Sequence, residues 1–210
     1  MLSRSLQHAR RLAAQARSSA APFSSSGASS SSSSSSLQAV FMAGIPGSGK
    51  TRIIEKRFGL LRDTGGSSHE GTLILDLDRE MRAHPAYDPE ARHTVYGVKG
   101  AYEWADERVE ERFQEAIQSP LLTRIVMDGT GTKVARRKQR MLDARAAGRW
   151  ITLLYVRASL ETALLRNTRR KRVVPTEVLE KYEATLEASV VELRPYADVI
   201  EIFDNDEDDP

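Results

Sequence analysis

The sequence predicts an α/β fold: a mostly parallel five-stranded sheet with helices on both faces. Short apolar runs alternate with longer stretches in which apolar residues recur at helical spacing. Strands that alternate with helices form parallel sheets, because each helix returns the chain to the edge where the previous strand began. None of the apolar runs approaches the length of a transmembrane helix. The strands are expected at residues 38–43, 72–76, 124–128, 150–156 and 198–203.

Helices are expected in the segments between these strands. Each segment has apolar residues three or four positions apart, as on the buried face of an amphipathic helix. In the segment before the third strand, the expected buried residues are Tyr102, Val109, Phe113 and Ile117. Short hydroxyl side chains favour helix N-caps and mark two helix starts. The expected helices are 50–61, 100–118, 133–147, one capped by Ser159, and one capped by Thr176 and running toward Leu193.

The loop after the first strand carries the most specific motif. Its residues, GIPGSGKT, match G-x-x-x-x-G-K-[ST] between a strand and a helix. The glycines let backbone N–H groups approach phosphate oxygens, and the N-terminus of the next helix attracts the same charge. Lys50 is expected to reach the β and γ phosphates, and the Thr51 hydroxyl to bind Mg²⁺. The sequence therefore predicts a P-loop that binds a nucleoside triphosphate through Gly44, Ile45, Pro46, Gly47, Ser48, Gly49, Lys50 and Thr51.

Carboxylates follow two other expected strands. Asp76 and Asp78 come after the second strand, and Asp128 ends the third. Ligands bind outside the carboxyl ends of parallel strands, so these acids are expected near the triphosphate. An aspartate there can take the proton of an acceptor hydroxyl, and Asp128 stands where an acid holds Mg²⁺ or the acceptor. The alternative is that they are ordinary loop acids or turn caps.

A dense basic run separates the last two expected helices. It contains Arg166, Arg169, Arg170 and Arg172. Arginines that close over a phosphoryl group stabilise its spreading charge during transfer. The alternative is a solvated basic face or an RNA-binding patch. There is no N-K-x-D guanine-binding motif, so a GTPase is disfavoured and a small kinase is favoured.

Residues 1–36 differ from the rest of the chain in composition. They hold four arginines and no acidic residue, and they end in a run of serines. This composition is typical of an organelle transit peptide followed by a disordered spacer. We expect targeting to the mitochondrion, with the plastid as the alternative. Without these arginines the net charge changes from +2 to −2, which disfavours a nucleic-acid partner.

Three further segments occur in an order that is found in one family. LDLDREMRAHPAY has a D-x-D pair followed by a basic residue and His-Pro, and IVMDGTG has an acid before Gly-Thr-Gly. RNTRRKRVVP has an arginine three residues before a proline. Together with GIPGSGKT, these segments make residues 40–193 similar to the zeta-toxin family of P-loop kinases. The loop alone is widely shared, but the ordered set is much more specific.

The resemblance implies a P-loop NTPase/kinase fold that uses ATP and Mg²⁺ to phosphorylate a hydroxyl of UDP-N-acetylglucosamine. It implies that Asp78 is the catalytic base, because Asp78 stands at the matching distance from His84-Pro85, with Asp76 as its partner at the strand end. The family often has glutamate where Asp128 stands. The remaining implied residues are Lys50 and Thr51 for the phosphates and Mg²⁺, Asp128 and Thr130 for the acceptor, and Arg166 and Arg172 for the lid.

The sequence thus predicts a kinase domain at 37–204 and an acidic tail at 205–210. The expected reaction transfers the γ-phosphate of ATP to a hydroxyl of a small molecule, such as a nucleotide sugar. Two alternatives stay open: a polynucleotide 5′-hydroxyl kinase, and a P-loop regulator that binds a nucleotide but has no acceptor. The chain has no cysteine, which excludes disulfides and a thiolate nucleophile. The sequence identifies no protein partner.

Overall fold

The computed structural model describes residues 37–59, 71–91, 94–170 and 173–206. They belong to one compact unit, residues 35–210. The expected transit peptide and spacer at 1–36 lie outside the described residues, and no helix among the described ones could cross a membrane. The elements are β1 (Gln38–Ala43), α2 (Lys50–Phe58), β2 (Thr72–Leu75), α3 (Leu77–Arg82), η1 (Thr94–Gly97), α4 (Ala101–Gln118), β3 (Arg124–Met127), α5 (Val134–Ala146), β4 (Trp150–Arg157), α6 (Leu160–Thr168), α7 (Thr176–Leu193), η2 (Arg194–Tyr196) and β5 (Val199–Asp204).

The five strands form one sheet in the order β2-β3-β1-β4-β5, and every described pairing is parallel. β1 lies at the centre, where Val40 pairs with Val126 on one side and Thr152 on the other. The chain adds β2 and β3 on one side of β1 and then crosses to add β4 and β5 on the other. This reversal creates a switch point at the end of β1, where ligands bind in open α/β sheets. The predicted fold class is confirmed.

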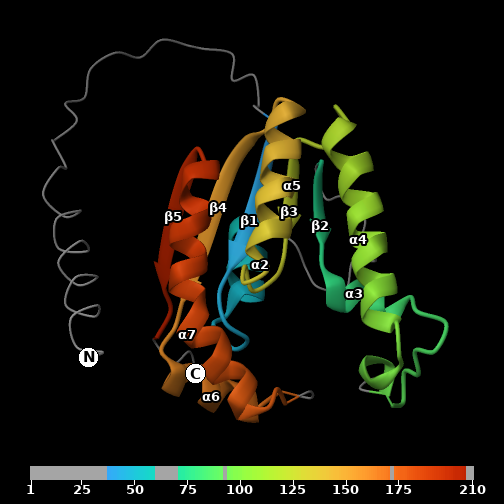
Figure 1. Cartoon of the computed structure of the whole chain (residues 1–210), viewed down its shortest axis with the longest axis vertical. Helices are drawn as coiled ribbons and strands as arrows, with labels where there is room; N and C mark the ends of the chain where they lie inside the picture. Colours follow the sequence, from blue (N-terminus) through green and yellow to red (C-terminus); the bar gives the residue numbers. More distant parts are fainter. Residues whose placement is uncertain (1–36, 60–70, 92–93, 171–172, 207–210) are drawn as a thin grey trace, which may run out of the picture. The chain divides into compact units, whose positions relative to one another are not determined.

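Helices cover both faces of the sheet (Figure 1). Ala39, Phe41 and Ala43 of β1 belong to the larger core, which also contains buried residues of α4, α5 and α7. Val40 and Met42 point to the opposite face and pack in a second cluster with residues of α2. The alternation follows from the two-residue period of a strand. Both faces of the central strand are therefore buried, as expected for a parallel sheet.

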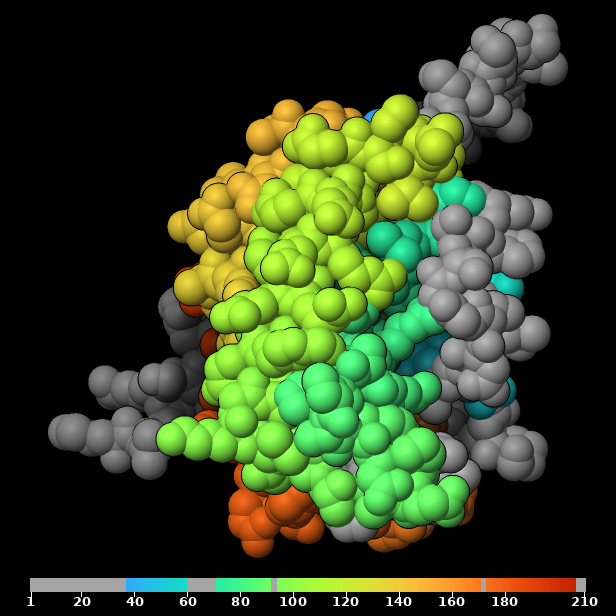
Figure 2. Space-filling model, turned by 90° about the vertical axis from the view of Figure 1, so that its right-hand side faces the viewer, coloured from blue at the N-terminus to red at the C-terminus, as the bar shows by residue number. Residues whose placement is uncertain are grey.

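A third cluster lies at the N-terminal end of α4. Met81 of α3, Val95 of η1, and Ala101 and Ala105 of α4 are fully buried together. In Figure 2 the segment containing α3 and η1, in green, lies against one end of α4, in yellow-green. Buried Glu80 adds ion pairs from this segment to two arginines of α4. The cluster therefore fixes the segment that follows β2, which carries two of the expected site residues.

The structure adds one helix and corrects three local predictions. The added helix is α3, directly after β2, where Asp76 is the N-cap and the sequence analysis named no element. The helix expected at 50–61 ends at Phe58, because Gly59 takes a left-handed conformation (φ 65°), and Leu61 lies outside the described residues. Pro175, not Thr176, is the N-cap of α7. Tyr102 is 41% exposed, whereas Val109, Phe113 and Ile117 are buried as expected.

Arg149 anchors the C-terminal end of α4 to the start of β4. Its buried guanidinium donates to four carbonyl oxygens, those of Ala116 (2.8 Å), Ile117 (3.0 Å), Ser119 (2.9 Å) and Leu122 (2.8 Å). The last carbonyl oxygens of a helix have no hydrogen-bond partner within the helix. Here the Arg149 side chain donates to several of them. Burial lowers the pKa of Arg149 from its ordinary value. The guanidinium therefore provides the hydrogen bonds that water would otherwise make to the carbonyl oxygens of the last turn of α4 and of the loop after it.

We expect Arg149→Met to lower the free energy of unfolding by roughly 3–4 kcal/mol, because it orphans several buried carbonyls. The melting temperature should fall by about 10 °C. Arg149→Lys is the matched control, since it keeps the charge but cannot spread its donors over four carbonyls, and it should recover less than half of the loss. Thermal denaturation measures both. A melting temperature for Arg149→Met within about 2 °C of the wild type would contradict this role.

Candidate active site

The glycine loop joins the C-terminal end of β1 to the N-terminal end of α2, as expected. Gly47 (φ 91°) and Gly49 (φ 89°) take left-handed conformations, and a Cβ at Gly47 would lie 2.6 Å from the carbonyl oxygen of Ala163. Gly49 is the N-cap of α2, and no side chain caps this helix end. Buried Ser48 has an Oγ without a hydrogen-bond partner. These groups form an anion site, with N–H donors at the helix end and a hydroxyl lacking an acceptor.

The Lys50 ammonium lies over this loop. Its Nζ donates to the carbonyl oxygens of Gly44 (2.8 Å) and Ile45 (2.9 Å). Burial lowers the pKa of Lys50 to about 8, Asp128 and Asp76 oppose this shift, and arginines at 137 and 170 add to it. When the pKa of a buried lysine lies this low, an anion placed beside it stabilises the charged form of the side chain. A triphosphate in the loop would be such an anion.

The structure brings together the three carboxylates that the sequence singled out. Asp76 accepts a hydrogen bond from the backbone N–H of Asp78 (3.0 Å), and an Asp78 Oδ1 accepts one from the Tyr96 hydroxyl (3.0 Å). Burial, followed by the charges of Asp128 and Asp78, raises the pKa of Asp76 to about 7. Asp128 and Asp78 are therefore both close enough to Asp76 for their charges to act on it. Tyr96 was not predicted as a site residue, because it lies on η1, outside any motif.

Thr51 and Asp128 fit the predicted Mg²⁺ site. Asp128 Oδ1 is buried and has no hydrogen-bond partner, so it has an oxygen lone pair to offer a cation. No group of three or more acidic, histidine or cysteine side chains within the described part of the chain could hold a metal by itself. Mg²⁺ in nucleotide sites needs no such group, because phosphates and water supply most of its ligands. The donor set of one hydroxyl and one carboxylate therefore suits Mg²⁺ bound with ATP.

Asp76→Asn is expected to stabilise the protein free of nucleotide and metal. The pKa of Asp76 is about 7 in the folded chain and 3.8 as its ordinary value, so between these values the folded state holds more protons than the unfolded state. Stability of the wild type therefore falls as the pH rises from about 4 to about 7. Asparagine caps a helix equally well and has no charge to bury. We expect a gain on the order of 1–3 kcal/mol at about pH 8 and none at about pH 4.

Thermal denaturation in the presence of EDTA at several pH values measures this difference. Asp88→Asn is the matched control, because exposed Asp88 accepts a similar bond from the N–H of Glu90 (2.9 Å). The control should change the melting temperature equally at every pH. A gain for Asp76→Asn that does not grow with pH would show that Asp76 is only a cap.

Thr130 lies directly beside the glycine loop. Its carbonyl oxygen accepts a hydrogen bond from Gly44 N–H (3.0 Å), and its Oγ1 lies 3.0 Å from that of Thr132. Gly131 takes a left-handed conformation (φ 89°), and a Cβ there would be 3.0 Å from Ala43. The loop after β3 therefore follows the end of β1 closely. Thr130 therefore lies beside the glycine loop, within the segment that follows Asp128.

Arg166 approaches the glycine loop from α6. Its Nη1 donates to the carbonyl oxygen of Asn205 (2.8 Å), whose side chain donates to the carbonyl oxygen of Ser48 (2.8 Å). Arg170 lies near enough to Lys50 to lower its pKa. Arg172, the second expected lid arginine, lies outside the described residues. The described part of the basic run thus reaches the predicted phosphate site.

Arg137 also lies at the candidate site, although the sequence did not predict it. Its Nη1 donates to the carbonyl oxygen of Met42, and its guanidinium lies beside Gly129. Burial lowers the pKa of Arg137 to about 10, with Arg140 adding to the shift and Asp128 opposing it. The signal was available: Arg137 shares a helical face with Met141 and Ala144, which are buried. A cation on the buried face of a helix has a structural or catalytic partner nearby.

The comparisons with known proteins agree with the fold. Residues 40–189 match the family model described as an AAA domain, whereas no curated protein sequence matches. A structure from the PezAT chromosomal toxin–antitoxin system of Streptococcus pneumoniae is 20% identical, with a TM-score of 0.63 over 98% of this chain and 78% of that chain.

Two other solved structures show the same fold. A chain from the AvrRxo1-ORF1:-ORF2 structure with ATP is 16% identical, with a TM-score of 0.55 over 75% of this chain and 51% of that chain. This chain therefore spans about half the length of that relative. A candidate kinase of Chloroflexus aurantiacus is 15% identical, with a TM-score of 0.50 over 81% and 89% of the two chains.

The family match includes the glycine loop, the three carboxylates and most of α7. The strand order, the central position of the loop and the agreement with the PezAT structure support the resemblance seen in the sequence. The chain belongs to the AAA domain family and has the fold of the zeta-toxin-like P-loop kinases.

Proposed function

We propose that the protein transfers the γ-phosphate of ATP to a hydroxyl of a small molecule, a nucleotide sugar such as UDP-N-acetylglucosamine. The observation that carries this proposal is the cluster of three carboxylates, those of Asp76, Asp78 and Asp128, beside the glycine loop. These negative charges repel a triphosphate, and the burial of Asp76 is costly on its own account. A protein that only binds nucleotide needs one acid for Mg²⁺ and gains nothing from the other two. A kinase needs one acid to hold Mg²⁺ and another to take a proton.

Each side chain of the candidate active site has a role in the proposed reaction. Lys50 exchanges the carbonyl oxygens of Gly44 and Ile45 for the β and γ phosphates. Mg²⁺, held by Thr51 and Asp128 together with the phosphates, would neutralise charge on the γ-phosphate. Asp78, oriented by the Tyr96 hydroxyl, accepts the proton of the acceptor hydroxyl.

The acceptor oxygen then bonds to the γ-phosphorus, the bond to the bridging oxygen of ADP breaks, and ADP takes the released electron pair. Arg166 approaches from α6 and stabilises the charge that spreads over the transferring group. Asp76 holds the first turn of α3 in place and so fixes the direction of Asp78.

The experiment that tests the proposal measures ADP formation by the full chain with ATP, Mg²⁺ and one candidate acceptor at a time. The panel contains nucleotide sugars, nucleosides, free sugars and 5′-hydroxyl oligonucleotides. We expect ADP formation to depend on a nucleotide sugar. Turnover with oligonucleotides alone would favour the polynucleotide kinase, and ATP binding with no acceptor-dependent turnover would favour the regulator.

A further inference from the structure

The buried face of α6 lies against the glycine loop. The two buried residues of this helix are Ala163 and Asn167, which are one helical turn apart. The carbonyl oxygen of Ala163 lies so close to Gly47 that a Cβ on this glycine would be 2.6 Å away from it. A side chain on the next turn of α6 can therefore act on residues near the triphosphate site without contacting the triphosphate itself.

Asn167 makes two hydrogen bonds with the backbone of one residue. Its Nδ2 donates to the carbonyl oxygen of Val174 (2.7 Å), and its Oδ1 accepts from the N–H of Val174 (3.0 Å). Asn167 is 3% exposed, so its amide would be costly to bury without these partners. A primary amide has both a donor and an acceptor, whereas a carboxylate lacks the donor and an aliphatic side chain lacks both. The amide therefore ties the end of α6 to the residue before Pro175, the N-cap of α7.

The same turn sets the direction of Arg170. The backbone N–H of Arg170 donates to the carbonyl oxygen of Asn167 (3.1 Å), directly after the C-cap of α6. The Arg170 side chain is exposed, yet its charge lies close enough to Lys50 to lower the pKa of that lysine. Like charges repel, and an exposed arginine turns away from another cation unless its backbone directs it. The backbone after α6 therefore directs this arginine toward the triphosphate site.

We propose that Asn167 is a positioning residue, which fixes the turn after α6 through Val174 and so holds Arg170 within reach of a bound triphosphate. The inference rests on the proposed function, because it takes the glycine loop as the ATP site. Arginine binds phosphate through several N–H groups in one plane, so its direction decides how many of them meet phosphate oxygens. An arginine that is fixed in advance also loses less conformational entropy on binding. Loss of the Asn167 amide should therefore weaken ATP binding through Arg170.

A double-mutant cycle on the full chain tests this inference, with the affinity for ATP and Mg²⁺ measured by isothermal titration calorimetry. Asn167→Leu removes both hydrogen bonds, Arg170→Gln removes the charge, and a third protein carries both changes. We expect Arg170→Gln to weaken ATP binding by about tenfold, and Asn167→Leu by about threefold to tenfold. The double variant should bind ATP no more weakly than Arg170→Gln, because Asn167 acts through Arg170.

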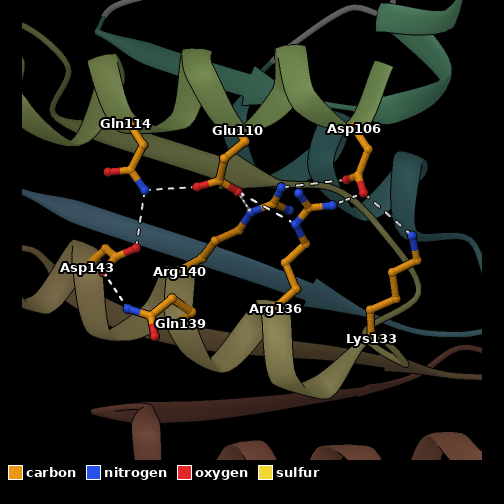
Figure 3. A network of polar contacts seen from close by, with 8 residues as sticks. All are labelled: Asp106, Glu110, Gln114, Lys133, Arg136, Gln139, Arg140 and Asp143. Carbon is orange, nitrogen blue, oxygen red and sulfur yellow. Dashed lines mark hydrogen bonds and ion pairs between the residues drawn. The ribbon is translucent and has the colours of Figure 1, made fainter. Parts of the chain in front are cut away.

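Salt dependence separates positioning from a loss of packing. Salt screens the contact between an exposed cation and a phosphate, so ATP binding should weaken more steeply with ionic strength for the wild type than for either single variant. Glu110→Gln is the matched control, because Glu110 pairs with Arg136 (3.8 Å) and Arg140 (2.8 Å) in the network between α4 and α5 (Figure 3). This control removes an ion pair between two other helices and should keep the wild-type affinity and salt dependence. Asn167→Ala is measured as well, since alanine removes both hydrogen bonds without the bulk of leucine, and melting temperatures identify any variant that is not folded.

Additive losses in the double variant would overturn the inference. So would a folded Asn167→Leu or Asn167→Ala protein that keeps the wild-type affinity or the wild-type salt dependence, and either result would assign the amide to packing between α6 and α7. The readout is ATP binding, so it is independent of phosphoryl transfer. Failure of the wild-type chain to bind ATP would reject both this inference and the proposed function. Coupled losses in a chain that transfers phosphate to no acceptor would support this inference and contradict the proposed function alone.

Discussion

Replacing Lys50 with alanine should lower phosphoryl transfer at saturating ATP by at least about a hundredfold. The ammonium donates to the loop carbonyls at 2.8 and 2.9 Å and lies near the charges of Asp128 and Asp76. Preorganised donors aimed at developing negative charge contribute roughly 3 kcal/mol each to the transition state. Since the side chain is already desolvated, its interaction with phosphate is strong.

Initial rates of ADP formation measure this loss once an acceptor is known. Lys56→Ala is the matched control, because Lys56 is exposed in the last turn of the same helix. It should keep the wild-type rate. Wild-type turnover by a folded Lys50→Ala protein would mean that the glycine loop does not bind the triphosphate as proposed.

Asp78→Asn should lower phosphoryl transfer by roughly a hundredfold to ten-thousandfold, which is the usual contribution of a general base. The amide has the size of the carboxyl and can still accept a hydrogen bond from the Tyr96 hydroxyl. It cannot take the proton of the acceptor. ATP affinity should change little, because Lys50 and the loop amides are untouched.

Asp76→Asn provides the comparison, since its side chain caps α3 and asparagine retains that bond. It should cost less activity than Asp78→Asn. Rates and ATP affinities of both variants decide between the two acids. If Asp76→Asn is inactive and Asp78→Asn is active, Asp76 is the general base and Asp78 is not. If both variants keep full activity, neither aspartate is the general base.

The parts of the site that could be predicted from the sequence depend on local geometry. The loop from Gly44 to Thr51 is defined by its own residues and by the strand and helix at its ends. Asp76 and Asp128 follow strands of a parallel sheet, whose carboxyl ends share one edge. Their proximity therefore follows from topology, and the structure confirms it.

The features that were not predicted depend on short elements or on contacts between distant segments. The helix α3 has six residues, too few to show a helical period, and its N-cap is also a site residue. Asp106 pairs with Lys133, Arg136 and Arg140, but nothing in the spacing of α4 and α5 fixes which residues face each other. Tyr102 has an apolar ring at a helical position, yet it lies beside Lys133 and stays half exposed.

The most direct test of the central claim measures both products of one reaction. The full chain is incubated with Mg²⁺, ATP labelled in the γ-phosphate, and the acceptor that supports the fastest turnover. ADP and labelled acceptor are then quantified together, with Lys50→Ala as the blank. The mechanism predicts equal amounts of ADP and phosphorylated acceptor. Formation of ADP together with free phosphate, and no label on the acceptor, would contradict it.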